Sequence, residues 1–263
     1  MSKGSLVSRL GFMSLTWRFT AGPTLRDCRC ADHVAGVPLA RGNSGGLRMV
    51  APMNTTRIFL IRHGETEWNI AGRLQGWQDS ALSAQGLAQA MRLAESLVGL
   101  DAAALICSDA GRALATAGTI GLRLGLTPQA DPRLREISFG HWEGHISAGL
   151  PPEVLVAKEG IMAMDPTCTL ALPGGESPAT VSARAWSCLD ELANRHAGAT
   201  VLVVSHGGVL ASVLRTVLGI PPGMPRRYRI GNTAIVQLIH CPGAAWLVDF
   251  DDLDPLTPAS RPA

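Results

Sequence analysis

Several features that define whole classes of protein are missing from this chain of 263 residues. No CxxC pair occurs, and the Cys28–Arg29–Cys30 spacing is too tight for an ordinary two-ligand metal knuckle. No apolar run approaches the roughly 18 residues that would indicate a transmembrane helix. We therefore predict a cytoplasmic protein with reduced, mostly structural thiols, no membrane span, and no metal or other cofactor. The six cysteines are Cys28, Cys30, Cys107, Cys168, Cys188 and Cys241.

The distribution of charge gives no reason to expect a nucleic-acid partner. The formal net charge is +2, with 17% charged residues. Residues 1–50 contain seven Lys or Arg against two Asp, and the remainder has 16 basic against 19 acidic residues. The main body is therefore mildly acidic and lacks the basic footprint that nucleic acid requires.

The N-terminal segment differs from the rest of the chain. The stretch "RLGFMSLTWRF" is interrupted by polar residues, whereas a secretory signal needs an apolar core of about 7–15 residues. Residues 35–56 are rich in Gly, Pro and Arg, which is typical of a linker. We expect residues 1–52 to be a disordered extension or to lie upstream of the natural start at Met49 or Met53. The domain then spans 53–250, with a loose tail at 251–263.

From residue 57 onward, short apolar runs alternate with amphipathic stretches. Strands are predicted at 57–61, 103–107, 200–205, 233–240 and 244–250, with helices at 83–99, 111–125, 177–196 and 207–219. Ser83 and Ser177 are expected N-caps, and Leu87, Met91, Ala94, Leu97 and Val98 are expected on one buried face. This alternation predicts a three-layer α/β/α sandwich with a mostly parallel sheet.

Polar residues follow three of the predicted strands. Arg62 and His63 follow the first, Ser108 to Arg112 follow the second, and His206 follows the third. Ligands of open α/β sheets bind at this carboxyl edge. Two arginines and two histidines there lack enough nearby acids to neutralise them, and a phosphate dianion would do so. Glycines 64, 207 and 208 would let backbone N–H groups approach the same anion.

The motifs carrying these residues occur in a recognisable order. "RHGETEWN" resembles the signature of the histidine phosphatase superfamily, the group of cofactor-dependent phosphoglycerate mutases and related phosphatases. The resemblance continues through "GRLQGWQDSALSAQG", "SDAGRALATA", "LREISFGHWEG", "LPGGES" and "VVSHGGVL". It covers roughly residues 57 to 250 and implies a phosphoglycerate mutase-like fold.

The resemblance also implies a role for each matching residue. His63 would be the nucleophile and Glu136 the proton donor to the leaving alkoxide. The phosphate-binding residues would be Arg62, Asn69, Gln75, Gly76, Arg112, His206 and Gly207. The chemistry is consistent, because neighbouring cations keep a histidine nucleophile neutral and guanidinium groups can stabilise phosphoryl transfer without Mg²⁺.

Some assignments have alternatives within the sequence. His206 could be a structural histidine, and Arg112 could belong to a solvated helix face. Glu143 competes with Glu136 for the acid role. We favour Glu136 because a strand-like "RLREIS" would turn it inward and Arg135 outward, whereas Glu143 follows Gly140 in a loop that looks more mobile. The run 226–229 is interpreted as a solvated loop.

The family contains both mutases and phosphatases, so the reaction must be inferred from other features. In the mutases a basic cluster lies in the insert before the "GGES" turn. Here that insert has one lysine, Lys158, and no arginine. We therefore favour a phosphatase for a small phosphorylated metabolite, such as a phosphosugar, phosphoserine, a phosphoglycerate derivative or ribazole phosphate. A phosphoglycerate mutase and a catalytically idle anion-binding module are the alternatives, and a homodimer is left open.

Overall fold

The sheet of the computed structural model has six strands in the order β6-β5-β7-β4-β8-β9. The structure describes residues 33–34, 37–41, 47–49, 54–244 and 246–249. The strands are β6 (Pro128–Ala130), β5 (Ala102–Cys107), β7 (Thr200–Ser205), β4 (Thr56–Arg62), β8 (Ile235–His240) and β9 (Leu247–Asp249). The first four pair in parallel, whereas β8 and β9 are antiparallel. The predicted mostly parallel α/β sheet is confirmed.

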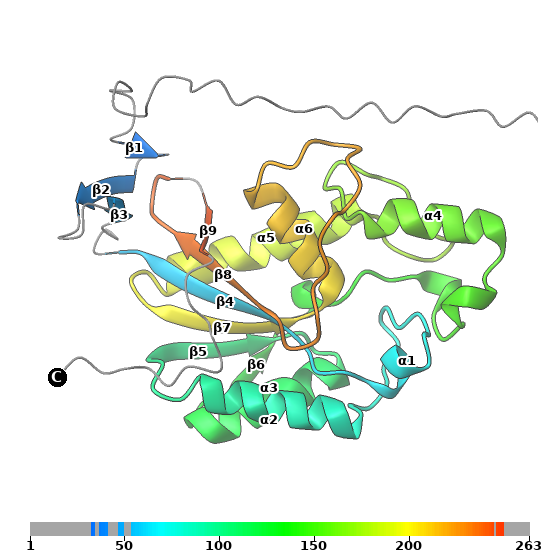
Figure 1. Ribbon diagram of the computed structural model, residues 1–263, viewed down its shortest axis with the longest axis horizontal. Helices are drawn as coiled ribbons and strands as arrows, with labels where there is room; N and C mark the ends of the chain where they lie inside the picture. Colours follow the sequence, from blue (N-terminus) through cyan, green and yellow to red (C-terminus); the bar gives the residue numbers. More distant parts are fainter. Residues whose placement is uncertain (1–32, 35–36, 42–46, 50–53, 245, 250–263) are drawn as a thin grey trace, which may run out of the picture.

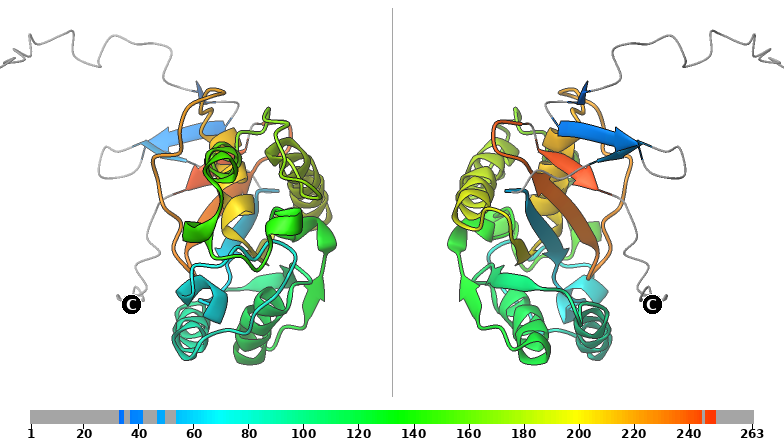
Figure 2. Two further views of the ribbon diagram at one scale, coloured as in Figure 1. Left: turned by 90° about the vertical axis from the view of Figure 1, so that its right-hand side faces the viewer. Right: turned by 90° about the vertical axis from the view of Figure 1, so that its left-hand side faces the viewer.

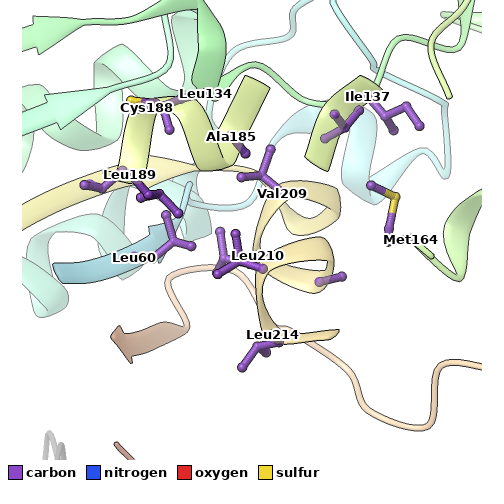
Figure 3. Packing of buried hydrophobic residues seen from close by; sticks show 14 of the residues in the cluster. Leu60, Leu134, Ile137, Met164, Ala185, Cys188, Leu189, Val209, Leu210 and Leu214 are labelled. Carbon is purple, nitrogen blue, oxygen red and sulfur yellow. The ribbon is translucent and has the colours of Figure 1, made fainter. Parts of the chain in front are cut away.

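Helices cover both faces of this sheet. Helices α2 (Ala84–Ser96) and α3 (Gly111–Leu124) lie on one face, and α5 (Pro178–Arg195) and α6 (Gly207–Val217) lie on the other (Figures 1 and 2). Successive strand residues point to opposite faces. In β4, Leu60 accordingly packs in the α5–α6 core beside Leu189 and Leu210 (Figure 3), while Ile61 packs in the α2–α3 core.

The ends of the helices agree with the sequence signals. Ser83 and Ser177 accept hydrogen bonds from the backbone N–H groups of Gly86 and Thr180 and thereby cap α2 and α5. Gly125 ends α3 in the left-handed conformation that favours glycine. The parallel strands then direct the residues that follow β4, β5 and β7 to one edge, where α1 (Glu67–Ile70) and α4 (Pro152–Met162) lie (Figure 1).

Two predictions about local structure were wrong. "RLREIS" is not a strand: it begins with a 3₁₀ turn, Pro132–Leu134, and continues irregularly to further 3₁₀ turns at Gly140–Trp142 and Ser147–Gly149. In the predicted helix 83–99, Leu87, Met91 and Val98 are 47%, 63% and 48% exposed, although Ala94 and Leu97 are buried as predicted. Small side chains bring α2 close to α3, so the buried stripe follows Ala90, Leu93 and Ala94 instead.

Within the N-terminal segment the structure describes three short strands, β1 (His33–Val34), β2 (Val37–Arg41) and β3 (Leu47–Met49). They form a separate antiparallel sheet. Most of residues 1–52 and all of the tail at 251–263 lie outside the described residues, so the predictions about them stay predictions. None of the described helices is long and apolar enough to cross a membrane.

Candidate active site

Arg62 and His63 are fixed by the sheet itself. Arg62 is the last residue of β4, and the His63 N–H donates to the Ser205 carbonyl of β7 at 3.0 Å, which continues the parallel ladder. The Arg62 guanidinium is anchored by a 2.6 Å hydrogen bond from Nη1 to the Ile230 carbonyl. Burial lowers the pKa of Arg62, an effect that Glu136 opposes and that Arg226 and Arg112 reinforce.

The tautomer of His63 follows from its contact with the backbone. Its Nδ1 lies 2.7 Å from the Gly64 carbonyl, which can only accept, so Nδ1 bears the proton and Nε2 has the free lone pair. Burial, followed by the charges of Arg112 and Arg62, holds the pKa of His63 well below its ordinary value. A neutral ring with Nε2 unprotonated is the form a nucleophile requires.

His206 lies beside His63 at the beginning of α6, and its ring is fully buried. The two ring centroids are 5.1 Å apart, and Nε2 of His206 lies 2.8 Å from Oγ of Ser108. Burial, followed by the charge of Arg112, holds the pKa of His206 well below its usual range. The start of α6 packs against Arg62, since a Cβ at Gly207 would lie at ordinary contact distance, 3.4 Å, from Nε of this arginine.

Arg112 projects from the first turn of α3 and is 1% exposed, which excludes a solvated helix face. Its Nη1 pairs with Asp79 at 2.8 Å and also donates to the Gln78 carbonyl at 3.0 Å. Its Nη2 donates to the Gly76 carbonyl at 2.8 Å. Residues 76–79 therefore hold both terminal nitrogens of the Arg112 guanidinium. These contacts do not include its third nitrogen, Nε.

Three buried nitrogens in this group have no hydrogen-bond partner among the described residues. They are Nε of Arg62, Nε of Arg112 and Nδ1 of His206. Buried polar nitrogens are normally paired, so three unpaired ones from three separate segments need an explanation. A bound anion with several acceptor oxygens supplies one, and phosphate suits guanidinium geometry in particular.

Glu136 contacts the first turn of α6, close to the same group. Its carboxylate accepts hydrogen bonds from the Gly208 N–H, at 3.1 Å to both oxygens, and from the Ile137 N–H at 2.9 Å. A side chain at Gly208 would overlap this carboxylate, so the contact requires a glycine. Its carboxylate is close enough to Arg62 to oppose the effect of burial on that arginine's pKa. Glu136 therefore lies next to Arg62.

The rival acid, Glu143, occupies a different environment from the one predicted. It is 9% exposed, and its carboxylate accepts hydrogen bonds from the N–H groups of Trp77, Gln78 and Phe139 and from the hydroxyl of Ser138. The expectation of a loosely held loop residue was therefore wrong. These four donors engage both Glu143 oxygens, and none of them belongs to the group of Arg62, His63, Arg112 and His206, whereas Glu136 lies beside Arg62, so Glu143 is the less suitable proton donor.

The other predicted phosphate ligands surround this core. Asn69 caps α1 reciprocally with Thr66, and its Oδ1 also accepts from Asn232. Gln75 is buried, donates to the Thr66 hydroxyl, and leaves its own Oε1 without a partner in the described part of the chain. Gly76 supplies the carbonyl that holds Arg112. Their contact with phosphate stays a prediction.

Sequence reasoning missed several residues that shape the site. Asp79 orients Arg112, and Asn232 donates to the His63 carbonyl at 3.1 Å. Arg226 was assigned to a solvated loop, yet it is half-buried and close enough to lower the pKa of Arg62. Asp79 lies within the motif "GRLQGWQDSALSAQG", so the sequence contained a signal for it. Asn232 and Arg226 lie outside these motifs, and only the fold brings them to the site. Within the described ranges no group of three His, Cys, Asp or Glu side chains could hold a metal ion.

Comparisons with known proteins find relatives of this chain in sequence and in structure. The chain is 37% identical over 182 residues to a protein named probable phosphoglycerate mutase GpmB from Yersinia pestis, covering 69% of this chain and 84% of that one. It is similar to the solved structure of Bacillus stearothermophilus YhfR, with TM-score 0.66, 33% identity, and coverage of 74% and 96%. A mycobacterial glucosyl-3-phosphoglycerate phosphatase gives TM-score 0.64, 33% identity, and coverage of 74% and 97%.

A solved structure described as a putative alpha-ribazole-5'-P phosphatase from Escherichia coli gives TM-score 0.65 at 27% identity, covering 74% of this chain and 95% of that one. The sequence pattern of one family matches residues 58–252, which is most of the chain and includes every residue assigned to the site. The chain belongs to the histidine phosphatase superfamily (branch 1).

Proposed function

We propose that this protein is a phosphatase that hydrolyses a phosphate monoester of a small metabolite through a phosphohistidine at His63. The observation that carries the proposal is the set of three unpaired buried nitrogens, on Arg62, Arg112 and His206, beside a neutral histidine. Such a set binds a phosphoryl group and presents a nucleophile to it.

The first step transfers the phosphoryl group to the protein. Nε2 of His63 attacks phosphorus while the bond from phosphorus to the leaving oxygen breaks, and Glu136 gives its proton to that oxygen. Arg62 and Arg112 stabilise the charge on the phosphoryl oxygens, which is the role metal ions have in other phosphoryl-transfer enzymes. In the second step water attacks the phosphohistidine, the phosphorus–nitrogen bond breaks, and Glu136 takes the proton from water.

The surroundings of the acid favour a leaving group without further negative charge. A cavity of about 260 Å³ next to Glu136 is lined by Gly76, Trp77, Asp109, Ala110, Arg135 and Glu136. Arg135 pairs with Asp109 through two contacts of 2.7 and 2.5 Å, and this pairing raises the pKa of Arg135 and lowers that of Asp109. The charge of Arg135 in the cavity wall is therefore already neutralised by Asp109. Arg135 is a poor partner for a carboxylate or a second phosphate on the substrate.

Two observations bear on the mutase alternative. The 37% identity to a protein named as a probable phosphoglycerate mutase supports it. Against it, the single lysine of the insert, Lys158, donates to the Ser147 hydroxyl at 2.5 Å. We therefore place the hydrolase first. A catalytically idle anion-binding module is the third candidate, although each residue type needed for turnover is present.

A screen of phosphate monoesters separates the three candidates. p-Nitrophenyl phosphate, glucose 6-phosphate and 3-phosphoglycerate are each supplied in EDTA, with and without a bisphosphate primer, and both free phosphate and isomerised product are measured. We expect free phosphate without primer and no loss in EDTA. Isomer that depends on primer would identify a mutase, and absence of turnover on every ester would identify a binding module. Activity lost in EDTA and restored by Mg²⁺ would contradict the metal-independent mechanism.

A further inference from the structure

Glu143 is a buried carboxylate whose negative charge is stabilised by hydrogen-bond donors and not by a cation. Its Oε1 accepts from the Trp77 N–H at 3.0 Å, the Phe139 N–H at 2.9 Å and the Ser138 hydroxyl at 2.8 Å. Its Oε2 accepts from the Gln78 N–H at 2.8 Å. No lysine or arginine in the described residues forms an ion pair with it. The position of these backbone groups is therefore tied directly to one side chain.

The loop that Glu143 holds is the loop that holds Arg112. The carbonyls of Gly76 and Gln78 accept from the two terminal nitrogens of Arg112, and Asp79 pairs with the same guanidinium. Gly76 has φ +57°, and a side chain there would overlap the Glu143 carboxylate, so the loop packs closely onto this residue. The N–H groups of the loop face Glu143 while its carbonyls face Arg112.

The same carboxylate also contacts the segment that carries the acid. Ser138 and Phe139, which donate to Glu143, follow Glu136 by two and three residues. The loop is joined to this segment a second time, because Nε1 of Trp77 donates to the Glu136 carbonyl at 3.0 Å. Glu143 therefore lies where the support of Arg112 meets the support of Glu136.

We propose that Glu143 is a positioning residue that sets Arg112 and Glu136 at a fixed separation by binding the 76–78 loop to the 138–139 segment. It touches neither the phosphate nor the leaving group. The inference rests on the proposed function in so far as Arg112 binds the phosphate and Glu136 supplies the proton.

The matched test is Glu143→Gln, which preserves size but replaces one acceptor oxygen by a donor. With the amide oxygen at the Oε1 position, the amide nitrogen meets the Gln78 N–H, and the loop must shift. We expect kcat/KM to fall about tenfold on both an alkyl phosphate and p-nitrophenyl phosphate, because misplaced positioning groups reduce turnover. The inhibition constant of inorganic phosphate should rise by about the same factor.

The inhibition constant separates positioning from general loss of structure, since it does not depend on the fraction of protein that is active. Asp165→Asn is the control, because Asp165 is another buried carboxylate that accepts backbone N–H groups, from Thr167 and Gly223. We expect that control to lower the melting temperature and leave the inhibition constant unchanged. If Glu143→Gln does not fold, Ser138→Ala takes its place, because it removes one of the four donors to Glu143. It should lower kcat/KM and raise the phosphate inhibition constant by a smaller factor.

Coupling to Arg112 completes the test. In an Arg112→Lys background there is no guanidinium for the carbonyls of the 76–78 loop to orient. Adding Glu143→Gln to that background should therefore change the inhibition constant of phosphate less than twofold. Three results would each overturn the proposal. They are an unchanged phosphate inhibition constant in Glu143→Gln, fully additive effects of Glu143→Gln and Arg112→Lys on that constant, and a loss of kcat/KM confined to the alkyl ester. If the wild-type protein turns over no ester, phosphate affinity by calorimetry tests Glu143 independently of the proposed function.

Discussion

Arg62, His63 and His206 lie at the ends of β4 and β7, where the hydrogen-bond ladders of a buried parallel sheet fix the backbone. Glu136 lies between two 3₁₀ turns in a segment that belongs to no strand. The two regions contact each other through the Gly208 N–H and the Glu136 carboxylate. They are nevertheless held in place by different kinds of interaction.

The acid segment depends on side chains that are distant in sequence. Arg184 of α5 donates to the carbonyls of Arg133, Arg135 and Glu136 at 2.7, 2.6 and 3.0 Å and pairs with Glu176. Where sheet ladders are absent, these contacts satisfy the backbone. The comparison teaches that Arg62, His63 and His206 are positioned by backbone pairing, whereas Glu136, like Arg112 with its partner Asp79, is positioned by a few charged side chains.

The largest expected effect is at the phosphate-binding region. His63→Ala should lower kcat/KM by about 10³-fold or more on every ester, since it removes the nucleophile. Rapid mixing of wild type with labelled substrate should trap a phosphoprotein that is labile in acid and stable in base, and the variant should give none. An acid-stable adduct, or one that persists in the variant, would contradict the assignment of His63.

The next effect depends on the leaving group. Glu136→Gln should lower kcat/KM by about 10²-fold on an alkyl phosphate, the usual size of general acid catalysis. The loss should be much smaller on p-nitrophenyl phosphate, whose leaving group needs little protonation. Steady-state kinetics on the two esters measure the difference. Equal losses on both would show that Glu136 is not the proton donor.

A smaller effect isolates the support of the acid. Arg184→Gln should reduce activity on the alkyl ester by about tenfold because the carbonyls around Glu136 lose their donor. The inhibition constant of phosphate should stay within twofold of wild type, in contrast to the result expected for Glu143→Gln. Arg123→Gln, which removes an exposed pair with Glu95, is the control and should change neither quantity. A rise in the inhibition constant of phosphate equal to the loss of activity would mean that Arg184 supports the phosphate-binding residues as well as Glu136.

The regions also differ in how far the sequence predicted them. Apolar runs at β4, β5 and β7 indicated a parallel sheet, and the shared carboxyl edge of such a sheet brought Arg62, His63, Arg112 and His206 together. The acid segment was predicted as a strand. Its hydrogen bonds come from Arg184 and Glu176, about 40 to 50 residues further along, and no local pattern reports them.

The role of Glu143 was missed for a similar reason. Its partners Trp77 and Gln78 lie 66 and 65 residues before it in the chain. A glycine-rich loop in the sequence looked mobile, although a buried carboxylate organises it. The buried face of α2 was predicted wrongly because large apolar side chains were weighted above small ones. Close packing against α3 buries Ala90 and Ala94, while Met91 stays in solvent.

The last prediction concerns stability, and it applies to the phosphate-binding region alone. Burial and the neighbouring arginines hold the pKa values of His63 and His206 well below the ordinary value near 6.5. Between the folded and unfolded pKa values the unfolded chain binds more protons, so the free energy of unfolding falls as the pH drops below about 6.5.

The slope should reach at most about 1.4 kcal/mol per pH unit for each histidine, and the two together should give no more than about twice that. Chemical denaturation between about pH 7.5 and 5.5 measures it, and His63→Ala should make the slope shallower by up to one histidine's share. Arg123→Gln, whose exposed charge contributes to neither histidine's shift, should leave the slope unchanged. A wild-type stability that is flat or rises toward pH 5.5 would show that the two histidines are not held neutral by the fold.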